Sequence, residues 1–250
     1  MGAFSPDAGC TIPTNLVSYW NLDETSGSRA DSFGSETLTD NNTVTGATGK
    51  VSGAAQFTAA NSEYLSHADD AALSTGDIDF TFAYWLYMDS KSAEMHTISK
   101  SGVLNREYDL VYDPGSDRFY WQVSSTGISF DGQVQASSFG APSTGTWCFF
   151  VHWHDSVNNV IGIQVNNGTV DTTSFSAGVN DGTSAFHIGA EVAAPAQRYW
   201  DGRIDEVGFW KKVLSAQEKT DLYNSGNGNT YNPSGTCVLA AQHRMFALFD

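Results

Sequence analysis

Short runs of apolar and aromatic residues alternate along this chain with clusters of Gly, Asn, Asp and Ser, a pattern typical of strands joined by tight turns. The longest run, 78–87, puts one row of side chains from Phe80 to Leu86 on one face and a second row from Thr81 to Tyr87 on the other. Both rows are rich in aromatic residues, so we expect both faces to be covered. Further strands are predicted at 16–20, 53–57, 63–66, 95–99, 108–112, 118–123, 147–154, 160–165, 169–175, 186–189 and 202–209.

Two local motifs refine this pattern. Asn166-Asn-Gly168 joins two predicted strands, and its Asn-Gly pair can supply the positive φ angles of a two-residue hairpin turn. Ser215 and Glu218 have the spacing of a capping box, which predicts a short helix beginning after Ser215. About a dozen strands, one C-terminal helix and no βαβ alternation predict an all-β fold, a two-sheet antiparallel sandwich.

The 250 residues are compatible with one sandwich domain, flanked by two short segments. We expect an N-terminal arm at 1–15, the sandwich at 16–223, and a linker with an apolar C-terminal tail at 224–250. Residues 236–250 are too short to fold alone. This tail either packs on its own domain or docks on a neighbouring subunit.

The net charge of −16 disfavours nucleic acid and anionic membrane surfaces as partners, because both carry negative charge. The N-terminus lacks a basic segment followed by an apolar run, so we expect no signal peptide. No run approaches the roughly 20 apolar residues that a membrane-spanning helix needs, so membrane insertion is not expected.

The three cysteines differ in their surroundings. Cys148 lies in the apolar run 147–151 and is interpreted as a small buried hydrophobic residue. Cys10 and Cys237 lie near opposite ends of the chain, where they can form a disulfide or remain free thiols.

Several phrases, in this order, resemble the laminin-G-like family of the concanavalin A-like lectin/glucanase superfamily. They are Leu16-Val-Ser-Tyr-Trp-Asn-Leu-Asp-Glu24, Gly49-Lys-Val-Ser-Gly-Ala-Ala-Gln-Phe57, Asn61-Ser-Glu-Tyr-Leu-Ser66, Phe80-Thr-Phe-Ala-Tyr-Trp85, Gly145-Thr-Trp147, Val165-Asn-Asn-Gly168 and Gly202-Arg-Ile-Asp-Glu-Val207. The resemblance covers 16–223 and implies a jelly roll with loops at its rim. It does not determine function, since this scaffold carries lectins, receptor-binding modules, enzymes and structural parts.

The resemblance also implies a structural Ca²⁺ where the first and last strands meet. It points to Asp205, with Asp23, Glu24 and Asp31 as partners from the opening segment. The alternative is that Asp205 pairs with Arg203 or caps a turn.

Candidate ligand-binding residues are Arg198, Tyr199 and Trp200, which precede the last strand near an expected rim, together with Arg106. Aromatic rings can stack on sugar rings, and arginines can hydrogen-bond hydroxyl or carboxylate groups. The alternative is that the rings serve packing only.

His152 and His154 alternate on one strand, so they share a face with a spacing that zinc sites use. His96 or His187 would have to supply the third ligand. Solvated or groove-facing histidines are the favoured interpretation, because no motif aligns a third ligand.

Catalysis is not expected. The Glu-x-Asp-x-(x)-Glu cluster of glucanases on this scaffold is absent, and Asp77-Ile-Asp79 lacks a third acid. Asp205 and Glu206 are adjacent, so they are expected to point to opposite faces.

These observations predict a non-enzymatic adhesion or assembly module, by analogy with laminin-G-like decorations or fibre parts of tailed-phage particles. Its expected partners are a glycan or host surface at the rim loops, and other virion or self subunits at the termini. It would then occur on the virion, or outside the cell after lysis. The alternatives are a stand-alone carbohydrate-binding lectin-like module and a polysaccharide-cleaving enzyme of the same fold.

Overall fold

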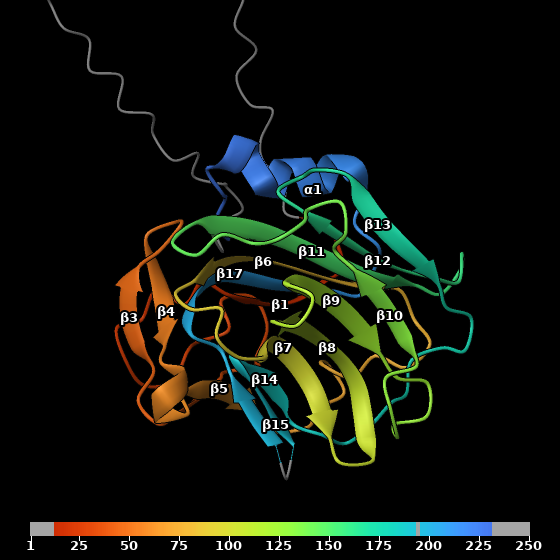
Figure 1. Cartoon of the computed structure of the whole chain (residues 1–250), viewed down its shortest axis with the longest axis horizontal. Helices are drawn as coiled ribbons and strands as arrows, with labels where there is room; N and C mark the ends of the chain where they lie inside the picture. The colour runs from red at the N-terminus through yellow and green to blue at the C-terminus, as the bar shows by residue number, and fades with distance from the viewer. Residues whose placement is uncertain (1–12, 194–195, 232–250) are drawn as a thin grey trace, which may run out of the picture.

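The computed structural model describes residues 13–193 and 196–231. Two antiparallel sheets pack face to face, and a short helix lies over the outer face of one of them (Figure 1). The prediction of an all-β, concanavalin A-like jelly-roll sandwich is confirmed.

The larger sheet has eight strands. In sheet order they are β13 (Val170–Ser174), β12 (Val160–Val165), β11 (Trp147–Asp155), β6 (Phe80–Met88), β17 (Gly202–Trp210), β4 (Gly53–Phe57) and β3 (Thr45–Thr48), with β1 (Leu16–Trp20) also paired to β17.

The smaller sheet has seven strands. In order they are β10 (Gly132–Gln135), β9 (Arg118–Val123), β8 (Asn105–Asp113), β7 (Met95–Gly102), β14 (Phe186–Ile188), β5 (Tyr64–His67) and β2 (Thr39–Asn41). A separate hairpin of β15 (Ala190–Ala193) and β16 (Ala196–Tyr199) continues from β14. The Gly189 N–H donates to the Thr97 carbonyl and the Ser99 hydroxyl donates to the Ala190 carbonyl, so the hairpin lies beside β7.

The main core lies between the sheets. Phe82 of β6 stacks on Phe209 of β17 at 4.5 Å between ring centroids, and on Phe186 of the opposite sheet at 6.1 Å. A second apolar cluster lies on the outer face of the larger sheet, where Trp85 and Trp153 meet Leu222 of α1 (Ala216–Tyr223). Strand β6 is therefore covered on both faces, as predicted.

The capping box is confirmed. The Ser215 hydroxyl accepts a hydrogen bond from the Glu218 N–H, and the Glu218 carboxylate accepts one from the Ser215 N–H at 2.8 Å. Two 3₁₀ turns, η1 (Ala59–Asn61) and η2 (Asn224–Gly226), complete the assigned elements of the described residues.

The turn between β12 and β13 differs from the prediction. Positive φ angles occur at Asn166 (52°) and Asn167 (53°), whereas Asn167 and Gly168 were expected to supply them. The Gly168 N–H donates to the Val165 carbonyl at 2.9 Å, which closes the turn around the two asparagines. Asn tolerates the left-handed region well enough for this arrangement.

Cys148 is buried, with a free thiol, as predicted. Cys10, Cys237 and the tail at 236–250 lie outside the described residues, as does most of the N-terminal arm. None of the described helices is long and apolar enough to cross a membrane.

Candidate functional site

The outer face of the smaller sheet carries a polar depression of about 290 Å³. Strand alternation creates this face: Tyr108, Leu110 and Tyr112 of β8 point into the core, so Asp109 points outward. Eight residues line the depression: Glu94, His96, Arg106, Gln122, Ser129, Phe130, Glu191 and Arg198.

The β15–β16 hairpin supplies one wall of this depression. Glu191 and Arg198 lie opposite each other in the hairpin, and an Arg198 Nη1 to Glu191 Oε2 contact of 2.5 Å joins them. The Arg198 Nε also contacts Glu94 Oε1 at 2.7 Å. Arg198 therefore joins the carboxylate of Glu191 to that of Glu94, which directly precedes β7.

His96 lines the depression beside this wall, and Asp109 is fully buried beneath it. Asp109 Oδ2 contacts His96 Nδ1 at 2.5 Å, and Glu94 Oε1 lies 3.1 Å from Nε2 of the same ring. Burial alone would lower the pKa of His96, but Asp109, Glu94 and Glu191 raise it to about 9. Burial raises the pKa of Asp109 to about 6, against the opposing effect of His96. At neutral pH the pair is therefore an imidazolium and a carboxylate.

Arg106 lies on the opposite side of the depression. Its Nη1 donates to the Ile128 carbonyl, and its guanidinium lies over the Phe130 ring at 5.6 Å. The structure thus brings Arg106 and Arg198, two of the predicted ligand-binding residues, into one depression although 92 positions separate them.

The other two predicted ligand-binding residues lie elsewhere. Tyr199 is half-buried against the Tyr64 ring, with 6.1 Å between centroids. Trp200 is fully buried and packs near Phe119 in the core. The prediction that Trp200 faces a ligand is therefore wrong, and the packing alternative holds for this ring.

The predicted calcium residues divide into two groups. Asp205 Oδ2 accepts hydrogen bonds from the N–H groups of Lys50 and Val51, and Asp23 Oδ1 accepts one from Gly53 in the same turn. Asp205 and Asp23 therefore meet at the 49–53 turn. Asp205 caps this turn, as one alternative expected.

Glu24 and Asp31 are engaged elsewhere. Glu24 accepts a hydrogen bond from the Ala30 N–H. Asp31 accepts four, from the N–H groups of Tyr19, Phe33, Gly34 and Glu36. Both carboxylates hold the opening loop.

The carboxylate that lies beside Asp205 is that of Glu206, and not that of Glu24 or Asp31. Asp205 and Glu206 are 0% and 3% exposed, and the Asp205 Oδ1 and Glu206 Oε1 atoms have no hydrogen-bond partner among the described residues. Burial and, for Glu206, repulsion by Asp205 raise the pKa of each group. Buried, unpartnered carboxylate oxygens are donors that suit Ca²⁺. Within the described residues, however, Asp205, Glu206 and Asp23 do not bring three ligand atoms within 4.8 Å of one another, so backbone oxygens would have to complete the site, and calcium binding stays a prediction.

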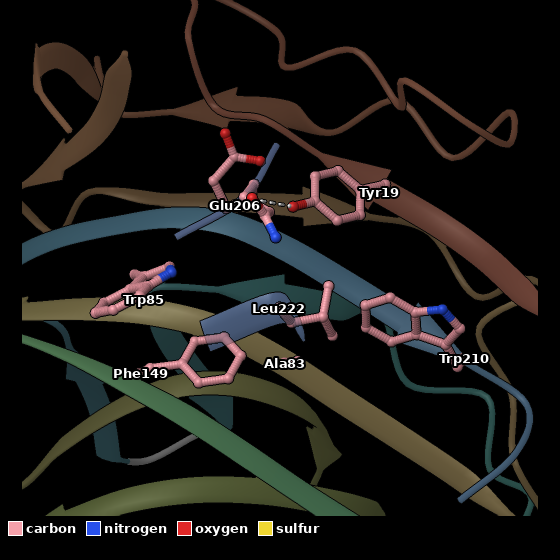
Figure 2. A pocket seen from close by; sticks show the side chains of 8 residues that line it. Tyr19, Ala83, Trp85, Phe149, Glu206, Trp210 and Leu222 are labelled. Atoms are coloured by element: carbon pink, nitrogen blue, oxygen red, sulfur yellow. Dashed lines mark hydrogen bonds between the residues drawn. The ribbon is translucent and has the colours of Figure 1, made fainter. Parts of the chain in front are cut away.

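Figure 2 shows a small cavity beside Glu206, lined by Tyr19, Trp85, Phe149, Trp210 and Leu222 among others. Its volume of about 10 Å³ is the size of one water molecule. The Tyr19 hydroxyl donates to the Asn229 carbonyl at 3.3 Å, so residues after α1 close this end of the molecule. The cavity is too small for a sugar.

The prediction that Asp205 and Glu206 point to opposite faces of the strand is wrong; both side chains are buried away from solvent. Glu206 has a φ of 51°, and the pairing of β17 with β6 shifts register between Asp205 and Gly208. This bulge interrupts the expected alternation of faces.

His152 and His154 share a face, as predicted, but this face is the core. The Nε2 of His152 contacts the Tyr84 hydroxyl at 2.9 Å, and its ring lies 4.0 Å from Trp121. His154 Nδ1 contacts the Ile78 carbonyl. The interpretation of solvated or groove-facing histidines is wrong, because both side chains are buried between the sheets.

Comparisons with known proteins agree with this architecture. A laminin G family model, described as concanavalin A-like lectin/glucanases superfamily, matches residues 57–218. The sandwich defines a concanavalin A-like jelly roll, and the chain belongs to this laminin G-like family. A comparison with curated protein sequences gives no match.

Solved structures with the same fold have different roles. Domain 4 of AbnA, an extracellular GH43 arabinanase from Geobacillus stearothermophilus solved with arabinotriose, is 17% identical with a TM-score of 0.60, covering 83% of this chain and 97% of that domain. A structure of botulinum neurotoxin type C, whose cell entry depends on two ganglioside molecules, is 10% identical with a TM-score of 0.63. Trypanosoma rangeli sialidase is 12% identical with a TM-score of 0.60.

The present chain spans only part of the last two structures. The match covers 84% of this chain and 51% of the toxin chain, and 87% of this chain and 34% of the sialidase. At these identities the comparisons show a shared fold and do not transfer an activity.

Proposed function

We propose that this chain is a non-enzymatic glycan-binding module whose binding surface is the depression on the smaller sheet. The observation that carries the proposal is the convergence of Arg106, Arg198, Gln122 and Phe130 around one open hollow. Guanidinium and amide groups can hydrogen-bond sugar hydroxyls, and an aromatic face can pack against the C–H groups of a sugar ring.

Arg106, rather than the net charge of the lining, favours a glycan that carries an acidic group, because Glu94 and Glu191 also line the hollow and are joined there by Arg198. The chain has 12 Lys and Arg residues against 28 Asp and Glu, yet two arginines share this hollow. The Arg198 side chain already contacts Glu94 and Glu191, whereas the guanidinium of Arg106 donates one hydrogen bond among the described residues, to the Ile128 carbonyl. Arg106 is therefore the better donor for a ligand carboxylate.

The fold relatives support a carbohydrate ligand. One is a domain solved with arabinotriose, and another belongs to a toxin that depends on gangliosides. These ligands are facts about those proteins, and they make neutral and acidic oligosaccharides suitable first probes.

The test is a glycan array followed by calorimetric titration of each positive oligosaccharide. Arg106→Ala and Gln122→Ala should each weaken binding by roughly tenfold or more, the loss of one or two hydrogen bonds to a polar ligand. Arg118→Ala on β9 is the matched control, because Arg118 is outside the lining and contacts the Asp117 carbonyl. Equal affinity in all three variants would place the ligand elsewhere.

The non-enzymatic part of the proposal needs its own assay. Incubation with β-glucans, arabinan and alginate should release no reducing ends and form no unsaturated uronate absorbance. Activity above a heat-treated control that disappears in His96→Gln would instead establish the polysaccharide-cleaving alternative, since His96 lines the hollow.

We propose further that the module is displayed on a virion surface, attached through its termini and released by lysis. Supporting this arrangement, the Trp210 Nε1 donates to the Pro13 carbonyl, and Tyr231 packs on Tyr19 at 5.6 Å. The first and last described residues thus contact the paired strands β1 and β17, so the described part of the chain begins and ends near the same pair of strands.

Attachment through the tail is tested by removing residues 236–250 and measuring mass by light scattering. We expect the full chain to associate with itself or with particle proteins, and the truncated chain to lose this association while keeping its melting temperature. A monomeric full chain that behaves like the truncated one contradicts a docking role for the tail.

A further inference from the structure

One cluster of metal-ligating side chains lies at the floor of the depression and has no role in the proposed function. Within the described part of the chain, His96, Asp109 and Glu191 are the group that brings three potential ligand atoms within 4.8 Å of one another. They come from β7, β8 and β15, so three separate segments converge here.

The cluster is built into the fold. His96, Asp109 and Glu191 are 3%, 0% and 2% exposed. Asp109 is fixed by the alternation of β8, and Glu191 is placed by the hairpin that follows Gly189, whose N–H donates to the Thr97 carbonyl of β7. A preorganised ligand set loses little side-chain entropy when an ion binds.

A second observation points to a missing ligand. The Asp109 side chain is fully buried, and its Oδ1 atom has no hydrogen-bond partner among the described residues. An unpartnered buried carboxylate oxygen is costly, so such atoms call for an explanation. A bound cation would supply the missing partner.

The remaining ligands keep the capacity to bind an ion. One Glu191 oxygen accepts from the Ser101 hydroxyl and the other contacts Arg198. Each carboxylate oxygen has two lone pairs, so each retains one for a metal. The imidazole of His96 supplies a nitrogen ligand once the metal displaces a ring proton and with it the contact of Nδ1 with Asp109 or of Nε2 with Glu94.

The charges in direct contact also suit a divalent cation. Glu94, Asp109 and Glu191 contribute three negative charges, and Arg198 contributes one positive charge. With a neutral, metal-bound imidazole, the group carries two net negative charges, which one divalent ion balances.

We propose that His96, Asp109 and Glu191 form a binding site for a divalent transition metal, with Zn²⁺ as the best match. One imidazole nitrogen and two carboxylate oxygens are a donor set that zinc accepts, whereas Ca²⁺ prefers oxygen alone. Ligand atoms bound to one zinc ion at about 2.0–2.2 Å lie roughly 3.3 Å apart. The potential ligand atoms of the three side chains lie within 4.8 Å of one another, so they must approach one another by up to about 1.5 Å when the ion binds.

The site opens into the hollow, since His96 and Glu191 are both in its lining. Three protein ligands leave at least one coordination position of zinc available. An oxygen donor from water or from a bound molecule in the depression can occupy it.

The primary experiment titrates Zn²⁺ into metal-free full-length protein by calorimetry, with Mn²⁺ and Ca²⁺ in parallel and no glycan present. We expect one Zn²⁺ per chain, weakened at least about tenfold in His96→Gln and in Asp109→Asn. His67→Gln is the matched control, because His67 lies on β5 of the same sheet and contacts Glu36 outside the cluster. Its affinity should equal that of the wild type.

A second measurement avoids variants that fail to fold. Paramagnetic Co²⁺, added to the wild-type protein, should shift or broaden the NMR signals of β7, β8 and β15 before those of β17. The absence of Zn²⁺ binding, equal binding in His96→Gln and His67→Gln, or Co²⁺ effects centred on Asp205 would each overturn the proposal. Glycan binding does not enter either readout, so the two proposals can fail separately.

Discussion

Asp205 and Glu206 are consecutive residues of β17, yet both side chains are buried and the carboxylates repel each other. The left-handed backbone at Glu206, with a φ of 51°, interrupts the alternation that would send them to opposite faces. Burial raises the pKa of both groups, and the charge of Asp23 raises each further. Two acids are thus held together where the first and last strands meet.

Replacing one member of this pair should stabilise the protein near neutral pH. When the pKa of a carboxyl group is higher in the folded protein than in the unfolded chain, the group stabilises the fold fully below its unfolded-state pKa. This stabilisation is lost as pH rises through the folded-state pKa. Glu206→Gln removes the titration, so its advantage over the wild type should grow from pH 5 to pH 8, to about 1–2 kcal/mol.

The comparison requires urea unfolding of both proteins at pH 5 and pH 8 in the presence of a chelator. Asn21 contacts Glu206 through its amide and can also contact a glutamine, so little packing is lost. An identical pH slope for the two proteins would show that Glu206 does not titrate in this range.

Calcium should act on the same pair. If the ion neutralises Asp205 and Glu206, excess Ca²⁺ should raise the melting temperature of the wild type above its value in chelator, because a ligand bound only by the folded state stabilises it. The increase should disappear in Asp205→Asn.

The control for this experiment is Glu24→Gln. Glu24 holds the Ala30 N–H and lies apart from the pair, so its variant should keep the calcium response. A wild-type melting temperature that is unchanged between calcium and chelator excludes a structural calcium here.

The parts of the fold that could be predicted from sequence are those with strong local patterns. Strand β6 has two apolar rows, and the Ser215 capping box is complete within four residues. The short strands β2, β3 and β10 were missed because they are polar or Gly-rich, and β3 is largely exposed. Periodicity cannot detect three or four residues without an apolar face.

The candidate site depends on contacts that no local pattern encodes. His96 meets Glu191 only because the β15–β16 hairpin lies beside β7, a contact across 95 positions. Asp109 occupies the one acidic position between Tyr108 and Tyr112, and alternation there could have identified it as an outward carboxylate on a buried strand. The bulge at Glu206 has one weak signal, the isolated Gly208 at the end of the register shift, whereas the left-handed position itself is a glutamate.

Ser215→Ala should destabilise the chain by about 1 kcal/mol, the typical cost of removing an N-cap hydroxyl. The change removes the bond from the Glu218 N–H to the Ser215 hydroxyl, whereas the Glu218 contact with Lys212 at 2.6 Å remains. Urea unfolding measures the loss, and Ser225→Ala in the exposed turn after α1 is the control. Equal stability of Ser215→Ala and the wild type would mean that packing of Leu222 alone holds α1.

His187 should make the protein sensitive to mild acid. It lies on β14, 8% exposed, with its ring edge against Tyr64 at 5.5 Å and its Nδ1 without a partner among the described residues. Burial lowers the pKa of His187 to about 4, against a smaller opposing effect of Glu191. The folded protein thus holds a neutral imidazole at pH 7, whereas the unfolded chain takes up a proton near pH 6.5.

The pKa of His187 is lower in the folded protein than in the unfolded chain. The contribution of His187 to the free energy of unfolding is therefore present above about pH 6.5 and is lost as pH falls toward about 4. Between pH 7.5 and pH 4.5, the wild type should therefore lose ~2–3 kcal/mol more unfolding free energy than His187→Gln. Urea unfolding of both proteins at the two pH values measures this difference, with His67→Gln as a partly exposed histidine control on the neighbouring strand. Most carboxylates lie apart from His187, so their effect on stability cancels when the wild type is compared with His187→Gln. An equal loss in these two proteins would show that His187 is protonated in the folded protein without cost.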